Sequence, residues 1–175
     1  MNPTIKGLFL KDLVRTVEKK GGSKKELSEY FEGNLDFSPL KNYSTEVLRK
    51  LHDATAIVLY GKNDGQTQFE LGKLGFKSYA NNLLIGKMML SLVEKNIDKI
   101  VSSLPKILNS VTPRLDVEMR PLGPNKIQMR IKNNDLHINF YSGLWTAAIE
   151  YFGYQPVIES KMIGRNDHEY IIEWR

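Results

Sequence analysis

Residues 68–95, QFELGKLGFKSYANNLLIGKMMLSLVEK, form the stretch on which the fold depends. Apolar and small residues recur along it at spacings of three and four positions. This pattern predicts one long helix with a stripe of apolar residues and glycines along one face. The stripe consists of Phe69, Gly72, Phe76, Tyr79, Leu83, Gly86, Leu90 and Val93, with Gly75 beside it. Each interior glycine costs about 1 kcal/mol relative to alanine. We therefore expect a neighbouring helix, a strand or a bound apolar molecule to come close to this helix.

The first 112 residues carry helical patterns almost throughout. Besides the long helix, the periodicity predicts helices at residues 4–20, 24–31, 45–60 and 96–111. Pro105 removes a backbone donor, so it either kinks the last of these or divides it into two short helices. His52 has polar neighbours and no second ligand one turn away, so we expect a surface histidine.

The pattern changes to a period of two after residue 113. Apolar and charged residues alternate in four segments separated by turns and by one helix with a glycine after its end. The segments are strands at residues 115–120, 127–132, 156–163 and 169–174, with the helix at 140–152. The predicted fold class is therefore α+β. A single domain, 1–175, has a helical subregion, 1–112, packed on a four-stranded antiparallel sheet in a ββαββ subregion, 113–175.

Composition limits the classes of function. The chain has 175 residues, 41% of them hydrophobic, no cysteine and a formal net charge of +5. Without cysteine there are no disulfides, thiolate nucleophiles or thiolate metal ligands. We find no apolar run long enough to cross a membrane and no signal-peptide order, so we expect a cytoplasmic protein without membrane insertion. The basic residues lack aromatic interleaving, so we do not expect nucleic-acid binding.

Motifs of catalysis and of cofactor binding are missing. The sequence contains no phosphate-binding loop, dinucleotide fingerprint, serine-hydrolase elbow or zinc-binding histidine pair. Paired carboxylates such as Asp116 and Glu118 fall on the polar face of a strand, where cross-strand partners such as Arg130 explain them. We therefore predict a non-enzymatic protein with no catalytic residues, no metal ligands and no cofactor.

Several stretches resemble a bacterial family of uncharacterised proteins, best represented in myxobacteria and described as a domain of unknown function. They are IKGLFLKDLV, FELGKLGFKSYANNLLIGKMMLSLV, LDVEMRPLGPNKIQMRI and YSGLWTAAIEYFGYQPVIESKMIGRNDHEYIIEW. The order of elements is also distantly similar to the superfamily of haem nitric-oxide-binding domains, four-vinyl-reductase domains and transport-particle subunits. That resemblance implies sensing or scaffolding around an apolar pocket. The haem branch has a Tyr-x-Ser-x-Arg motif, which this chain lacks.

Two hypotheses remain open at this point. The first is a sensory or regulatory module that holds a small apolar ligand between the 68–95 helix and the sheet. The second is a scaffold in which the glycine stripe packs against a protein partner, including a second copy in a homodimer. The candidate ligand-binding residues are Gly72, Gly75, Phe76, Tyr79, Leu83, Gly86, Leu90, His137 and Trp145.

Overall fold

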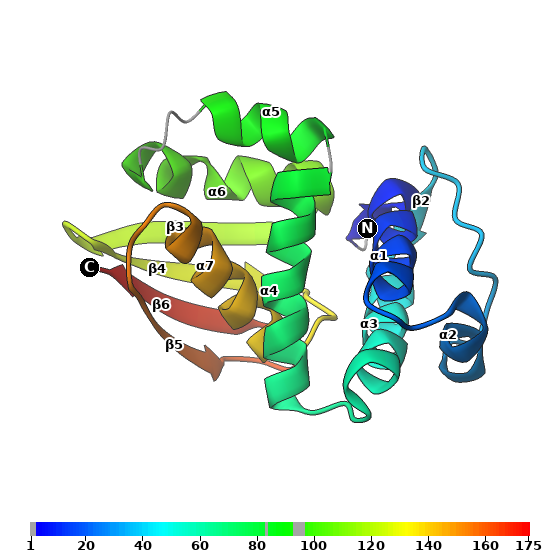
Figure 1. The fold of residues 1–175 in the computed structure, drawn as a ribbon. Helices are drawn as coiled ribbons and strands as arrows, with labels where there is room; N and C mark the ends of the chain where they lie inside the picture. Colours follow the sequence, from blue (N-terminus) through cyan, green and yellow to red (C-terminus); the bar gives the residue numbers. More distant parts are fainter. Residues whose placement is uncertain (1–2, 83, 93–96) are drawn as a thin grey trace.

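The computed structural model describes residues 3–82, 84–92 and 97–175. Helices dominate the first part of the chain, and the four longest strands follow (Figure 1). In chain order the elements are β1 (Thr4–Lys6), α1 (Gly7–Lys19), α2 (Lys24–Tyr30), β2 (Asn42–Ser44), α3 (Thr45–Tyr60), α4 (Gly65–Asn82), α5 (Leu84–Leu92), α6 (Ile97–Val111), β3 (Asp116–Gly123), β4 (Lys126–Lys132), α7 (Ile138–Tyr151), β5 (Pro156–Met162) and β6 (His168–Trp174).

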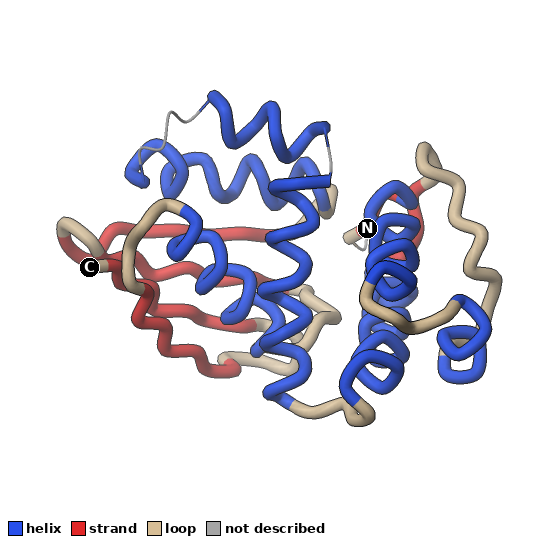
Figure 2. The backbone as a smooth tube through the Cα atoms, viewed as in Figure 1, coloured by secondary structure: helices blue, strands red, loops and turns tan. Residues whose placement is uncertain are grey.

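The molecule is layered around α7. The strands form an antiparallel sheet in the order β3-β4-β6-β5, and α6 and α7 pack on one of its faces. Helix α4 crosses α7 on the side away from the sheet, and α1 and α3 stand beyond α4 (Figure 2). The predicted α+β class and the antiparallel four-stranded sheet are confirmed.

The two faces of the sheet differ as the period of two predicts. On the covered face, buried residues of β4 and β6 lie opposite each other, as in the pair Met129 and Tyr170. On the outer face, Glu169 accepts a hydrogen bond from Arg130 Nε at 2.7 Å and forms an ion pair with Lys161 at 2.7 Å. These two cations hold the pKa of the Glu169 carboxyl below its ordinary value, Lys161 having the larger effect. Glu169 is thus paired with a cation on each of the two neighbouring strands.

The prediction of one long helix over residues 68–95 is wrong in one respect. Helix α4 ends at Asn82 and α5 begins at Leu84, and α5 runs off in another direction (Figure 1). A Cβ at Gly86 in α5 would lie 1.9 Å from the carbonyl oxygen of Tyr79 in α4. The glycine lets the start of α5 fold back on the end of α4, which a helical repeat does not reveal. Leu83 and residues 93–95 of the predicted helix lie outside the described residues.

Glycines also set the crossing of α4 and α7. A Cβ at Gly72 would lie 1.9 Å from the carbonyl oxygen of Phe140, and a Cβ at Gly143 would lie 1.9 Å from that of Phe69. The two helices therefore meet backbone to backbone at a reciprocal pair of glycines. The close approach of a neighbouring helix, one of the three expectations for the glycine stripe, accounts for Gly72.

Two further differences concern the helical half. Residues 4–6 begin no helix but form β1, which pairs with β2 so that Ile5 faces Tyr43. That pairing joins segments almost forty residues apart, and no local pattern marks such a partner. Pro105 lies inside a single helix, α6, rather than at a junction between two short ones.

The glycines of α4 allow a matched stability test. We expect Gly72→Ala to lower the free energy of unfolding by about 3 kcal/mol or more, because the new methyl group collides with backbone of α7. Gly75→Ala, three residues away, should raise it by up to about 1 kcal/mol, because a Cβ there meets only the Phe140 ring at 3.5 Å and alanine favours helix. Urea unfolding measures both, and equal effects of the two substitutions would contradict the crossing.

Candidate cavity between the helices

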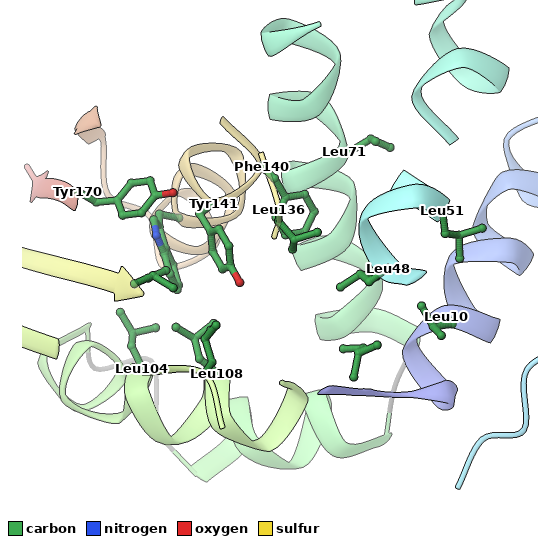
Figure 3. Packing of buried hydrophobic residues seen from close by; sticks show 14 of the residues in the cluster. Leu10, Leu48, Leu51, Leu71, Leu104, Leu108, Leu136, Phe140, Tyr141 and Tyr170 are labelled. Carbon is green, nitrogen blue, oxygen red and sulfur yellow. The ribbon is translucent and has the colours of Figure 1, made fainter. Parts of the chain in front are cut away.

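A cavity of about 150 Å³ lies among the helices. Its wall is almost entirely apolar and comes from β1, from helices α1, α3, α4, α5, α6 and α7, and from Leu136 just before α7 (Figure 3). Prominent lining residues are Phe9, Leu13, Leu48, Leu74, Leu104, Leu108, Leu136, Phe140 and Leu144. An apolar cavity of this size stays dry and accepts a guest such as benzene or xenon.

Five of the nine candidate ligand-binding residues line this cavity. They are Gly75, Phe76, Tyr79, Leu90 and Trp145. Gly75 lacks a side chain beside the Phe140 ring, so it leaves room at the wall.

The other four candidates have different places. Gly72 packs on the backbone of α7, and Gly86 packs on that of α4. His137 is exposed and precedes α7, where its Nδ1 accepts a hydrogen bond from the backbone N–H of Asn139 at 3.1 Å. Leu83 lies outside the described residues.

The cavity also differs in position from the site expected between the 68–95 helix and the sheet. Among the described residues, no residue of β3, β4, β5 or β6 lines it. Helix α7 occupies the space between α4 and the sheet, because the glycine crossing draws it against α4. The cavity therefore opens on the other sides of α4, toward α1, α3 and α6.

His52 is part of the wall, and its expected surface position is wrong. Its side chain is 6% exposed and lies against Phe140, with 4.5 Å between the ring centroids. Nδ1 has no hydrogen-bond partner among the described residues. Burial lowers the pKa of the imidazole to about 3, so the ring is neutral at ordinary pH. Helix α3 is buried on two of its sides, and the apolar stripe in its sequence predicts only one of them. His52 lies on the other buried side, so the pattern suggested an exposed position.

A row of aromatic rings runs from His52 along α7. Phe140 contacts Tyr141 edge to face at 5.5 Å, and Tyr141 stacks on Trp145 at 6.1 Å. Tyr141 and Trp145 are both 3% exposed and both line the cavity. Sequence reasoning selected Trp145 and missed Tyr141, although the four-residue spacing places the two on one face of a helix.

Three of the five buried side-chain polar atoms that lack a hydrogen bond among the described residues belong to this wall. They are His52 Nδ1, the Tyr79 hydroxyl and Trp145 Nε1, whereas Thr55 Oγ1 and Trp174 Nε1 lie outside it. Each such atom costs about 1–3 kcal/mol, so their presence in one wall calls for an explanation. Burial also raises the pKa of the Tyr79 hydroxyl, which keeps it protonated.

One polar cluster in the wall is satisfied. The Ser78 hydroxyl donates to Asp12 at 2.5 Å, and Ser78 and Thr16 hydroxyls lie 3.4 Å apart. These residues join α1 to α4 at the edge of the cavity. Asp12 is the one acidic residue of the wall, and no lysine or arginine accompanies it among the lining residues described.

Neither a metal-binding cluster nor a membrane-spanning helix is found in the described part of the chain. It contains no group of three histidine or carboxylate side chains that could hold a metal ion. None of its helices combines the length and the hydropathy that spanning a membrane requires.

Comparison with known proteins places the chain in a family. The sequence matches the family described as "Protein of unknown function (DUF2378)" over residues 1–175. The chain belongs to this family. Among curated proteins, none matches the sequence. The resemblance inferred from the sequence, to an uncharacterised family distantly similar to haem nitric-oxide-binding domains, is confirmed.

Solved structures of H-NOX proteins share the fold of this DUF2378 chain. A mutant H-NOX protein from K. algicida, in its Fe(II) unliganded form, is 13% identical with a TM-score of 0.73, and the match covers 98% of this chain and 97% of that one. The corresponding K. algicida protein without the mutation is 14% identical with a TM-score of 0.65 and the same coverage. A mutant H-NOX from T. tengcongensis is 16% identical with a TM-score of 0.62, and 98% of each chain is covered. At these identities the likeness shows the fold alone.

The buried histidine predicts a pH-dependent stability. An unfolded imidazole binds a proton near pH 6.5 and the folded His52 only near 3, so between these values the unfolded state holds more protons. Stability should therefore fall by about 1.4 kcal/mol for each pH unit below about 6.5. Urea unfolding at pH 7 and pH 5 should show the native protein losing about 2 kcal/mol more than His52→Leu. Equal losses in the two proteins would show that His52 titrates normally.

Proposed function

We propose that this protein is a non-enzymatic sensory or regulatory domain that holds a small apolar molecule in the cavity between its helices. The observation that carries the proposal is the cavity of about 150 Å³, with its apolar wall and its unpartnered buried polar atoms. Protein interiors are normally close-packed and their polar groups paired. An apolar cavity with a few polar groups in its wall is the usual form of a small-molecule site.

The position of the cavity suits a sensor. One side of its wall is Leu48 and His52 of α3 with Phe9 and Leu13 of α1, and another side is formed by α6 and α7. A guest would therefore contact the N-terminal helices and the sheet-bound helices together. A ligand shifts a protein between two arrangements only when it binds one of them more tightly than the other. A molecule at this junction would contact both groups of helices, so its contacts would change if the groups moved relative to each other.

Haem does not fit this site. One solved structure of similar fold, 17% identical with a TM-score of 0.60, concerns the modulation of haem redox potential through porphyrin distortion. A porphyrin needs a pocket at the large end of the usual range of about 300–1,000 Å³, and its carboxylate groups need cationic partners. The cavity here is about 150 Å³, and its described wall contains Asp12 but neither lysine nor arginine. We therefore propose a smaller guest and no haem.

The remaining expectations fit the same proposal. A domain of this kind works as a binding module without chemistry, and the absence of cysteine agrees with a cytoplasmic location. The scaffold hypothesis relied on free glycines in the stripe. Gly72 and Gly86 are instead covered by backbone of the chain itself, so the stripe offers a second copy little to pack against.

Toluene provides a direct probe. At ten times its Kd, a guest that binds only the folded state adds about 1.4 kcal/mol to the free energy of unfolding. We expect toluene to raise the melting temperature in a saturable way, and to lose this effect in Leu108→Phe, whose larger ring fills the cavity. Leu122→Phe is the matched control, because Leu122 is 44% exposed on β3 and lies outside the wall.

Two results would count against the proposal. No saturable stabilisation of the native protein would mean that the cavity does not bind such molecules. The same stabilisation in Leu108→Phe as in Leu122→Phe would mean that toluene binds elsewhere.

A further inference from the structure

The wall of the cavity contains a tyrosine hydroxyl that the fold itself does not use. Tyr141 is 3% exposed, and its hydroxyl points away from the sheet toward α6 and Leu108, which also lines the cavity (Figure 3). The hydroxyl makes no hydrogen bond to any residue in the described part of the chain. A buried phenol normally finds a partner.

A neighbouring tyrosine shows the ordinary arrangement. The Tyr170 ring lies 6.2 Å from that of Tyr141, but its hydroxyl donates to the carbonyl oxygen of Ile138 at 3.1 Å. It also lies 3.3 Å from His168 Nδ1. Tyr170 thus ties β6 to α7, whereas the Tyr141 hydroxyl has only the cavity before it.

Charge in the wall restricts what could meet this hydroxyl. Asp12 contributes a carboxylate to the cavity, and no lysine or arginine is found among the described lining residues. His52, the lining histidine, has its pKa lowered by burial and is neutral. An anion would therefore lose its hydration without gaining a counter-charge. An uncharged molecule avoids that cost.

We propose that the cavity binds a small uncharged molecule that consists of an aromatic or compact aliphatic hydrocarbon part and one hydrogen-bond-accepting oxygen. The Tyr141 hydroxyl donates a hydrogen bond to that oxygen. The inference rests on the proposed function and names the class of ligand for the same cavity. The apolar wall binds the hydrocarbon part, and Tyr141 selects for the oxygen. Trp145, stacked on Tyr141, holds the phenol ring in place.

Two probes of similar size test the oxygen. Acetophenone and α-methylstyrene have the same connectivity of heavy atoms and differ in having a C=O or a C=CH2 group. We define the preference as the Kd of α-methylstyrene divided by that of acetophenone, measured by ligand-dependent unfolding. The preference in the native protein should exceed that in Tyr141→Phe about tenfold, the value of one hydrogen bond. Dividing the preference of the native protein by that of Tyr141→Phe cancels the difference in hydration between the two probes.

Tyr141→Phe removes one oxygen that has no partner, so the variant should fold at least as stably as the native protein. Tyr151→Phe is the control, because Tyr151 is 52% exposed and outside the wall, and it should keep the native preference. Tyr79→Phe tests the other unpartnered tyrosine of the wall. A loss of preference in Tyr79→Phe but not in Tyr141→Phe would overturn the assignment to Tyr141.

The outcomes separate this inference from the function on which it rests. If neither probe binds the native protein, the proposed function fails. If both bind and the preference is the same in Tyr141→Phe, the cavity binds ligands but Tyr141 does not select them. Benzoate should bind at least tenfold more weakly than acetophenone, and equal or tighter binding of benzoate would overturn the uncharged class.

Discussion

The backbone crossing of α4 and α7 is the constraint on which the rest of the structure depends. Gly72 and Gly143 each face a carbonyl oxygen of the other helix, so neither position has room for a Cβ. The crossing fastens α7 to α4 on one side while its other side packs on the sheet. This double attachment fixes the direction of the α7 side chains that reach the cavity, Tyr141 and Trp145 among them. A separation of the helices by the width of a methyl group would change the shape of the cavity as well as the stability of the core.

The cavity is costly for a chain of this size. Unfilled volume in a core destabilises by about 24 cal/mol per Å³, so about 150 Å³ corresponds to roughly 3–4 kcal/mol. The unpartnered atoms of His52, Tyr79 and Trp145 add to this cost. Domains have a net stability of only about 5–15 kcal/mol. Ala148→Leu, or one larger residue on α6, would remove much of the penalty, and the guest proposed above would offset the same cost by filling the cavity.

Local patterns in the sequence were sufficient for the sheet and for most helices, because their signal lies in neighbouring residues. The alternation in β3–β6 predicted which faces are charged, and the glycines marked a close helix contact correctly. Two of the predictions that failed depended on distant partners, because the pairing of β1 with β2 and the burial of His52 are set by segments far away in the chain. The third, the fold-back of α5, places Gly86 against Tyr79 only seven residues earlier, where the helical repeat gives no sign of a break. The same reason explains the site: Trp145 stood out as a large aromatic residue, whereas Tyr141 became notable only through the missing partner of its hydroxyl.

The joint between the N-terminal helices and the rest of the chain lies beside the cavity. The side-chain hydrogen bonds that span it include one from Ser78 of α4 to Asp12 of α1 and one from Thr45 of α3 to Asp135 in the segment before α7. Asp12 and Ser78 themselves line the cavity, and Leu136 lines it beside Asp135. Under the proposed function, a guest in the cavity would contact both sides of this joint. Because packed interfaces switch between discrete arrangements and do not deform continuously, such a guest would favour one placement of α1 and α3 over another.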